Sequence, residues 1–186
     1  MSRASGCDDD WFENDGQITK RPVRALALSA LAPRRGEHLW DLGSGSGSIS
    51  IEWLLTGEEA TATAIERDAT RAERITRNAT RFGLSHRIQV KTGTAPDALD
   101  GLDPPDAVFI GGGLSEPLLT DLWARLAKGV RVVVHAVTLE SEALLARWQA
   151  EAGGTLLRIA LSEATPLGSR RGWTSAYPVV QWSVVR

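Results

Sequence analysis

The chain has 186 residues, 42% of them hydrophobic and 24% charged, with a formal net charge of −2. These values predict one globular domain (residues 1–186) and argue against a binder of duplex nucleic acid, which normally carries a basic surface. Cys7 is the single cysteine, which excludes an internal disulfide and a cysteine-based metal cluster, and we expect no bound metal. No apolar run approaches the roughly 18 residues that span a bilayer, and the N-terminal residues lack the apolar core of a secretion signal. We therefore expect a cytoplasmic protein without a membrane partner.

The first predicted element is a helix over residues 20–32, where apolar residues recur at helical spacing between Pro22 in the first turn and Pro33. The residues before it, 1–16, are polar and acidic, and we expect a flexible arm with Trp11 and Phe12 as an anchor. Beyond residue 36, short apolar runs alternate with helical patterns. The predicted strands are residues 38–42, 61–66, 88–92, 107–110, 130–135, 156–161 and 179–185. The predicted helices between them are residues 48–55, 69–82, 116–127 and 140–152.

Strands that alternate with helices predict right-handed crossovers and a mainly parallel sheet. The last two strands are joined by a loop without a helix, so we expect them to pair antiparallel. A mostly parallel, seven-stranded α/β sheet with a C-terminal antiparallel hairpin is the usual Rossmann-like layout of class I methyltransferases.

A glycine-rich loop lies between the first strand and the helix after it, with the sequence Gly43-Ser44-Gly45-Ser46-Gly47. Glycines at such a corner let a ligand lie against bare peptide groups. Glu66 ends the next strand about 20 residues further on, where a carboxylate can accept both hydroxyls of an adenosine ribose. This combination predicts a cofactor that contains a nucleoside.

The spacing of the loop separates two cofactor classes. A dinucleotide fingerprint needs a third glycine at position 48 or 50, and both positions hold serine. Asp41 lies two residues before the loop, where an acid is favourable beside the cationic S-adenosylmethionine and unfavourable beside a pyrophosphate. We therefore expect S-adenosylmethionine as the cofactor, with a nicotinamide oxidoreductase as the alternative from another class.

The residues on either side of the fourth predicted strand indicate what kind of methyl acceptor the pocket can take. Asp103-Pro104-Pro105-Asp106 is similar to an amine-binding motif, but it precedes the strand 107–110 and is interpreted as a turn at the far end from the cofactor. The strand is followed by Gly111, Gly112 and Gly113, which leave the pocket floor without side chains. That floor suits a bulky acceptor and provides no amine clamp.

Several segments resemble a known family, the cobalamin-pathway precorrin-6Y C15-methyltransferases (decarboxylating). The most specific is residues 15–26 (DGQITKRPVRAL), and the likeness continues at 39–49 (LWDLGSGSGSI), 95–99, 109–112 and 136–140. The resemblance implies methyl transfer to C15 of a reduced tetrapyrrole, with loss of carbon dioxide from the C12 acetate side chain. It also implies a homo-oligomer, often a tetramer. It further implies a C5-methylating domain as fusion partner, so that this chain would be the excised C-terminal half of a larger, bifunctional protein.

The resemblance carries the cofactor contacts onto Thr19, the loop from Gly43 to Gly47, Glu66 and Ala95, with Asp41 and Thr94 beside them. The chain departs from the family at Thr94, His135 and Tyr177, where Asp, Asn and Asn are common.

Cationic side chains are expected to bind the carboxylates of such an acceptor, and Arg170, Arg171 and Lys20 are the candidates. His135 ends a strand near the pocket and is the candidate for proton transfer. The arginines at 67, 71, 74, 77 and 81 are interleaved with acids at helical spacing and are interpreted as a solvated helix face.

Two further alternatives stay open at this point. One is a class I methyltransferase that acts on RNA, protein or another small molecule, against which the missing amine clamp and the acidic composition argue. The other is a catalytically silent cofactor-binding subunit.

Overall fold

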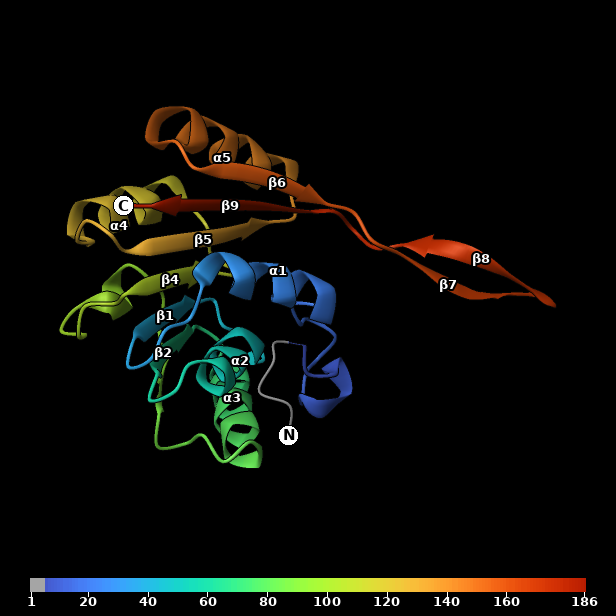
Figure 1. Cartoon of the computed structure of the whole chain (residues 1–186), viewed down its shortest axis with the longest axis horizontal. Helices are drawn as coiled ribbons and strands as arrows, with labels where there is room; N and C mark the ends of the chain where they lie inside the picture. The colour runs from blue at the N-terminus through green and yellow to red at the C-terminus, as the bar shows by residue number, and fades with distance from the viewer. Residues whose placement is uncertain (1–5) are drawn as a thin grey trace.

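The computed structural model describes residues 6–186, which form a three-layered α/β domain with one projecting arm (Figure 1). The helices are α1 (Arg21–Leu31), α2 (Ser48–Thr56), α3 (Ala69–Arg81), α4 (Glu116–Arg125) and α5 (Leu139–Ala152), with two short 3₁₀ turns at Asp9–Trp11 and Asp97–Leu99. The strands are β1 (His38–Leu42), β2 (Thr61–Glu66), β3 (Ile88–Thr92), β4 (Ala107–Ile110), β5 (Arg131–Ala136), β6 (Thr155–Ile159), β7 (Ser162–Leu167), β8 (Arg170–Ser175) and β9 (Val179–Val185).

The main sheet has seven strands in the order β3-β2-β1-β4-β5-β9-β6. Strands β1 to β5 are parallel, and β9 pairs antiparallel with both β5 and β6. The predicted sheet and its C-terminal antiparallel pair are confirmed. Strand order reverses between β1 and β4, and in such sheets the crevice for a ligand opens at this point, beyond the carboxyl ends of the strands.

Each face of the sheet has its own apolar core, because side chains alternate along a strand. On one face, Leu39 packs with α1 and α2 around the fully buried Trp53. On the other face, Trp40 and Leu42 pack with α4 and α5, where Trp182 is the largest fully buried side chain. Both faces are covered, and the ends of the strands remain available for a site.

The described part of the N-terminal arm, residues 6–16, makes hydrogen bonds and ion pairs with the domain, in addition to the expected aromatic anchor. Residues 1–5 lie outside the described part of the chain. Phe12 is buried and stacks on Phe82 with ring centroids 5.1 Å apart, whereas Trp11 is 39% exposed. Arg24, itself fully buried, donates to the carbonyl of Cys7 and pairs with Glu52 at 2.6 Å. Phe12 is thus an anchor, as predicted, but ionic contacts hold the arm as well.

The predicted loop between the last two strands is a second, two-stranded sheet. Strands β7 and β8 pair antiparallel and extend far from the body of the domain (Figure 1). Most of their residues are exposed, including Trp173 at 78% and Leu167 at 69%. Because neither face is buried, the strands carry no alternating apolar pattern. Gly168-Ser169 between them is a two-residue hairpin signal that the sequence does contain.

Within the described residues, no helix is both long and apolar enough to cross a membrane.

Candidate cofactor and acceptor site

A cavity of about 940 Å³ lies beyond the carboxyl ends of the parallel strands. It is lined by residues from the glycine loop, the ends of β2, β3, β4 and β5, and the segment before α1. Most of the residues singled out by the sequence lie in its wall: Thr19, Lys20, Gly43, Ser44, Gly45, Ser46, Glu66, Thr94, Ala95, Gly111, Gly112, Gly113 and His135.

The glycine loop is shaped by close backbone contact with the segment after β4. Gly43 has φ +68°, and a Cβ atom there would lie 2.6 Å from the carbonyl oxygen of Gly112. The amides of Gly43 and Ser44 both donate to the carbonyl of Ile65, which fixes the loop to the end of β2. Gly47 has φ +75° and precedes α2 directly, with its own Cβ position blocked by Ile75. The strand order and the glycines together leave bare peptide facing the cavity.

Glu66 holds the end of β2 against this loop. Its Oε2 accepts from the amide of Gly45 at 2.9 Å, and its Oε1 accepts from the amide of Asp68 at 3.0 Å. The side chain is only 5% exposed and lines the cavity. A carboxylate offers about four acceptor positions. Two are used by amides, so Glu66 retains capacity for two hydroxyl donors on the cavity side.

Asp41 and Gly47 do not line the cavity. The carboxylate of Asp41 is fully buried behind the loop, where its Oδ2 accepts from the amide and hydroxyl of Ser50 at 3.2 and 2.6 Å. Burial raises the pKa of Asp41 to about 6, against the hydrogen bonds from Ser50 that lower it. Asp41 therefore acts on the site through the loop and through its charge, without contact at the cavity wall.

A nucleoside cofactor fits these residues. The hydroxyl oxygen of Ser46 is buried at the cavity wall and has no hydrogen-bond partner among the described residues. Burial of an unsatisfied hydroxyl costs free energy, so a ligand atom is its natural partner. The bare backbone at Gly43 and Gly45 and the remaining acceptor positions of Glu66 complete a set suited to a ribose.

The cavity is also lined by His135 and by largely apolar residues from the C-terminal part of the chain. The His135 Nε2 lies 2.9 Å from Oε1 of Gln181, and the ring contacts Phe109 edge-on at 4.9 Å between centroids. Burial lowers the pKa of His135, which favours the neutral imidazole. The wall around it consists of Val137, Ile159, Leu161, Ala176, Tyr177 and Val179. This surface suits a flat, largely apolar acceptor.

Two predicted positions lie elsewhere. Arg170 and Arg171 are in β8 on the projecting arm and do not line the cavity of their own chain. The segment Asp103–Asp106 lies at the opposite end of β4, as interpreted, but it is an irregular connection and not a turn. The side chain of Asp106 accepts from the His38 amide at 2.8 Å, and the Asp103 carbonyl accepts from Trp40.

Sequence reasoning missed Gln17, Arg67, Arg71 and Tyr177, which also line the cavity. The arginine face of α3 is not simply solvated, because Arg71, Arg74 and Arg77 pair with Asp15 and Glu13 of the N-terminal segment. In the sequence, the only indication of these ion pairs was the presence of acidic residues at 13 and 15, just before the segment 16–20 that carries the resemblance.

The strand order, the glycine loop at the switch point and the acid at the end of β2 define a class I methyltransferase fold. A family model described as a precorrin methyltransferase domain matches residues 10–186. The chain belongs to this precorrin methyltransferase domain family.

Individual relatives agree with that assignment. The chain is 54% identical over 181 residues to a Sinorhizobium protein named precorrin-6Y C(5,15)-methyltransferase [decarboxylating], covering 97% of this chain and 44% of that protein. It is 36% identical over 142 residues to a probable cobalt-precorrin-6B C(15)-methyltransferase (decarboxylating) of Saccharolobus solfataricus, covering 73% and 71% of the two chains. The crystal structure of the C-terminal domain of precorrin-6Y C5,15-methyltransferase from Rhodobacter capsulatus matches with a TM-score of 0.97 and 54% identity over 100% of both chains. The chain spans about half the length of the first curated relatives.

Proposed function

We propose that the chain binds S-adenosylmethionine and methylates C15 of a precorrin, coupled to decarboxylation of the C12 acetate side chain. The observation that carries the proposal is the contact between Glu66 and Gly45, which places a carboxylate beside bare backbone at the switch point of the sheet. The names of relatives at 36–54% identity supply the substrate class.

The residues that would hold the cofactor form one side of the cavity. Glu66 would accept from the ribose hydroxyls, the hydroxyl of Ser46 would gain its missing partner, and the backbone from Gly43 to Gly45 would lie against the nucleoside. Thr19, Thr94 and Ala95 would contact its other faces. Bound there, S-adenosylmethionine supplies an electrophilic methyl group. The cation would also be stabilised by the buried carboxylate of Asp41 behind the loop.

The chain's own part in the reaction is alignment, exclusion of water and movement of protons. Gly111, Gly112 and Gly113 leave room for the macrocycle, and the apolar side of the wall, at Ile159, Leu161, Ala176 and Tyr177, would shield it. Lys20, 60% exposed at the cavity rim, would pair with an acceptor carboxylate. A reduced tetrapyrrole provides an electron-rich carbon and can accept the electrons left by decarboxylation. His135, kept neutral by burial and oriented by its hydrogen bond to Gln181, would relay the associated proton.

The test is incubation of the purified chain with S-adenosylmethionine and a precorrin that is unmethylated at C15. Mass spectrometry should show a product that has gained one methyl group in place of hydrogen and lost one carbon dioxide. A product with the methyl group alone would reject the decarboxylase half, and no methyl transfer to any corrin precursor would reject the whole proposal.

We propose further that copies of the chain assemble through the β7–β8 arm into a homo-oligomer, such as a tetramer. The arm exposes Trp173, Leu167 and two unpaired strand edges, a combination that favours association. In an assembly, Arg170 and Arg171 of one chain would become available to a neighbour. Light scattering of the chain and of a variant with residues 162–175 replaced by a short turn tests this, and equal masses would reject it.

The names of the longer relatives suggest one more partner. Because they join the 5 and 15 positions in one enzyme, we propose a C5-methylating domain or protein as the partner of this domain. The compartment that we propose for the reaction is the cytoplasm, where S-adenosylmethionine is made.

A further inference from the structure

The segment Glu13–Lys20 lies beside the glycine loop, and its C-terminal part forms one wall of the cavity. Residues 16–20 line the cavity, and a Cβ atom on Gly45 would lie 3.7 Å from the carbonyl oxygen of Gln17. The segment has no regular secondary structure, apart from a bend at residues 15–16. The side chains of Asn14 and Asp15 shape it locally by accepting from the amides of Gly16 and Gln17, and side chains of α3 and α1 hold it against the domain.

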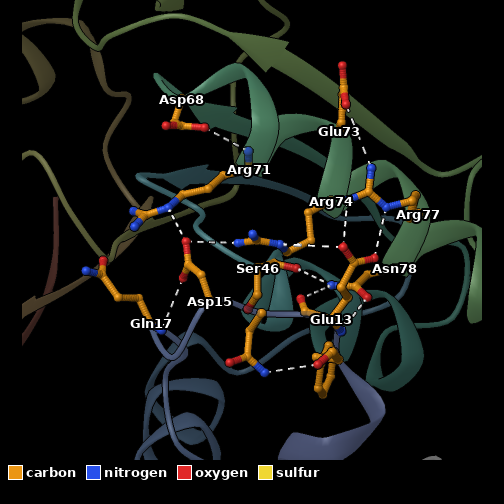
Figure 2. Close-up of polar contacts among 12 residues, drawn as sticks. Glu13, Asp15, Gln17, Ser46, Asp68, Arg71, Glu73, Arg74, Arg77 and Asn78 are labelled. Carbon is orange, nitrogen blue, oxygen red and sulfur yellow. Dashed lines mark hydrogen bonds and ion pairs between the residues drawn. The ribbon is translucent and has the colours of Figure 1, made fainter.

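Asn78 of α3 joins this segment to the glycine loop (Figure 2). Its Oδ1 accepts from the amide of Glu13 at 2.9 Å, and its Nδ2 donates to the carbonyls of Glu13 at 2.9 Å and Ser46 at 3.0 Å. One side chain thus satisfies both backbone groups of Glu13 and one of the loop. Asn78 is only 1% exposed, so these hydrogen bonds are shielded from water.

Three arginines of α3 hold the same segment by charge. Arg71 Nε and Arg74 Nη1 lie 2.9 and 3.0 Å from Oδ2 of Asp15, and Arg77 forms a bidentate pair with Glu13 at 2.6 and 2.9 Å (Figure 2). Hydrogen bonds, first from Arg74 and then from Arg71, lower the pKa of Asp15 to about 2. Asp15 is therefore ionised throughout the neutral range.

The far end of the segment is held separately. The fully buried Arg24 donates to the carbonyl of Thr19 at 2.6 Å and pairs with Asp9 and Glu52. Residues 13 and 15 are thus held by α3, residue 19 is held by α1, and the cavity wall lies between them. Release of the α3 contacts would free one end of the wall and leave the other in place.

We propose that Asn78, Arg71, Arg74 and Arg77 are positioning residues that hold residues 13–17 over the glycine loop and set the lifetime of the bound cofactor. This inference rests on the proposed function. These side chains do no chemistry. They keep a wall of the pocket closed on the ligand, and the wall must open at Glu13 and Asp15 for the ligand to leave.

The test measures dissociation of S-adenosylhomocysteine from the whole chain by stopped-flow or surface plasmon resonance. The ligand carries no net charge near neutral pH, so salt acts mainly on the protein. Glu13→Gln should speed dissociation about threefold and Glu13→Gln/Asp15→Asn about tenfold, in keeping with partly exposed ion pairs. For the unmodified chain, dissociation should quicken between about 0.05 and about 0.5 M KCl, because salt screens the pairs. The double variant should lose most of that salt dependence.

Arg35→Gln is the matched control, since Arg35 forms a bidentate surface pair with Glu59 at 2.6 and 3.1 Å, away from the cavity. It should leave the dissociation rate and its salt dependence unchanged. Asn78→Ala should give the fastest dissociation. Because Asn78 is buried and this variant could unfold, the two surface variants, whose thermal unfolding should match that of the control, decide the question.

Hydrogen exchange separates failure of this inference from failure of the proposed function. The Glu13 amide should be protected in the unmodified chain and exposed in the double variant. If S-adenosylhomocysteine does not bind the unmodified chain, the proposed cofactor is wrong, and the role in ligand lifetime is rejected with it. If the ligand binds and the double variant releases it at the unmodified rate, the positioning role alone is overturned.

Discussion

The Nε2 atom of His135 lies 2.9 Å from the Oε1 atom of Gln181, its registered partner across the antiparallel pair β5–β9. An amide oxygen only accepts, so the proton of the neutral imidazole lies on Nε2 and Nδ1 remains a base. The hydrogen bond also fixes the orientation of the ring at the cavity wall. The tautomer of His135 on the parallel strand β5 is thereby set by Gln181 on the antiparallel strand β9.

His135→Phe tests proton transfer by this ring. Phenylalanine keeps a ring against Phe109 but removes both nitrogens, so turnover in the precorrin assay should fall about 100-fold. Affinity for S-adenosylhomocysteine, measured by calorimetry, should not change. Gln181→Leu is the control, because it removes the partner but keeps the imidazole, and its turnover should fall much less. Equal turnover in His135→Phe and the unmodified chain would assign the ring a purely structural role.

Glu66→Ala tests the ribose contact. Loss of a charge-assisted hydrogen bond pair should weaken binding of S-adenosylhomocysteine by about 1–3 kcal/mol in calorimetry. Glu59→Ala removes a carboxylate that is 63% exposed and pairs with Arg35 away from the cavity, and it should bind normally. If the two variants bind equally well, Glu66 does not hold the ligand.

Gly43→Ala tests the close approach of the two backbones at the switch point. Gly43 has φ +68° and a blocked Cβ position, whereas Gly83 has φ +73° and open space. Gly83→Ala should therefore cost about 1–2 kcal/mol of unfolding free energy from backbone strain alone. Gly43→Ala should cost clearly more in urea unfolding and should abolish detectable ligand binding. Similar unfolding curves for the two variants would mean that the loop can move away from Gly112.

Asp41→Asn tests the buried charge behind the loop. Burial raises the pKa of Asp41 from 3.8 to about 6, so its folded form holds the proton more tightly than its unfolded form. The stability that this gives is fully present below pH 3.8 and is lost as pH rises through about 6. At about 1.4 kcal/mol per pKa unit, the loss is about 3 kcal/mol.

The measurement is urea unfolding of both proteins at several pH values from about 4 to about 8. The contribution of His135 to stability depends on pH in the opposite direction. Burial lowers its pKa, so its stabilising effect is lost as pH falls below 6.5. The comparison must therefore use the difference between the two proteins, in which His135 cancels. The free energy of unfolding of Asp41→Asn should increase relative to that of the unmodified chain as pH rises. If the difference in unfolding free energy between the two proteins does not vary with pH, burial does not raise the pKa of Asp41.

The sheet and its helices could be predicted from the sequence because their signals are local. Apolar runs such as residues 107–110 and 130–135 are buried on both faces, and Gly83 and Gly153 follow the ends of α3 and α5. The glycine loop and Glu66 were likewise found from spacing along adjacent elements. Their proximity follows from the strand order alone.

The missed features depend on contacts between distant residues or on exposed strands. The Glu13–Arg77 pair joins positions 64 residues apart, and nothing in the acidic composition of residues 6–16 shows which cations they meet. Tyr177 and Arg71 reach the cavity from segments whose local patterns are those of a loop and a charged helix. Strands β7 and β8 have no buried face to impose a period.

The place of β9 in the sheet has a consequence for how the domain is made. Strand β9 is inserted between β5 and β6, so β6 joins the main sheet only through the residues 179–185 that follow it in the chain. During synthesis, β5 and β6 can emerge from the ribosome and still have no partner on this side. The edges of β5 and β6 are paired only when residues 179–185 are in place, so a chain without this strand would expose both edges to association.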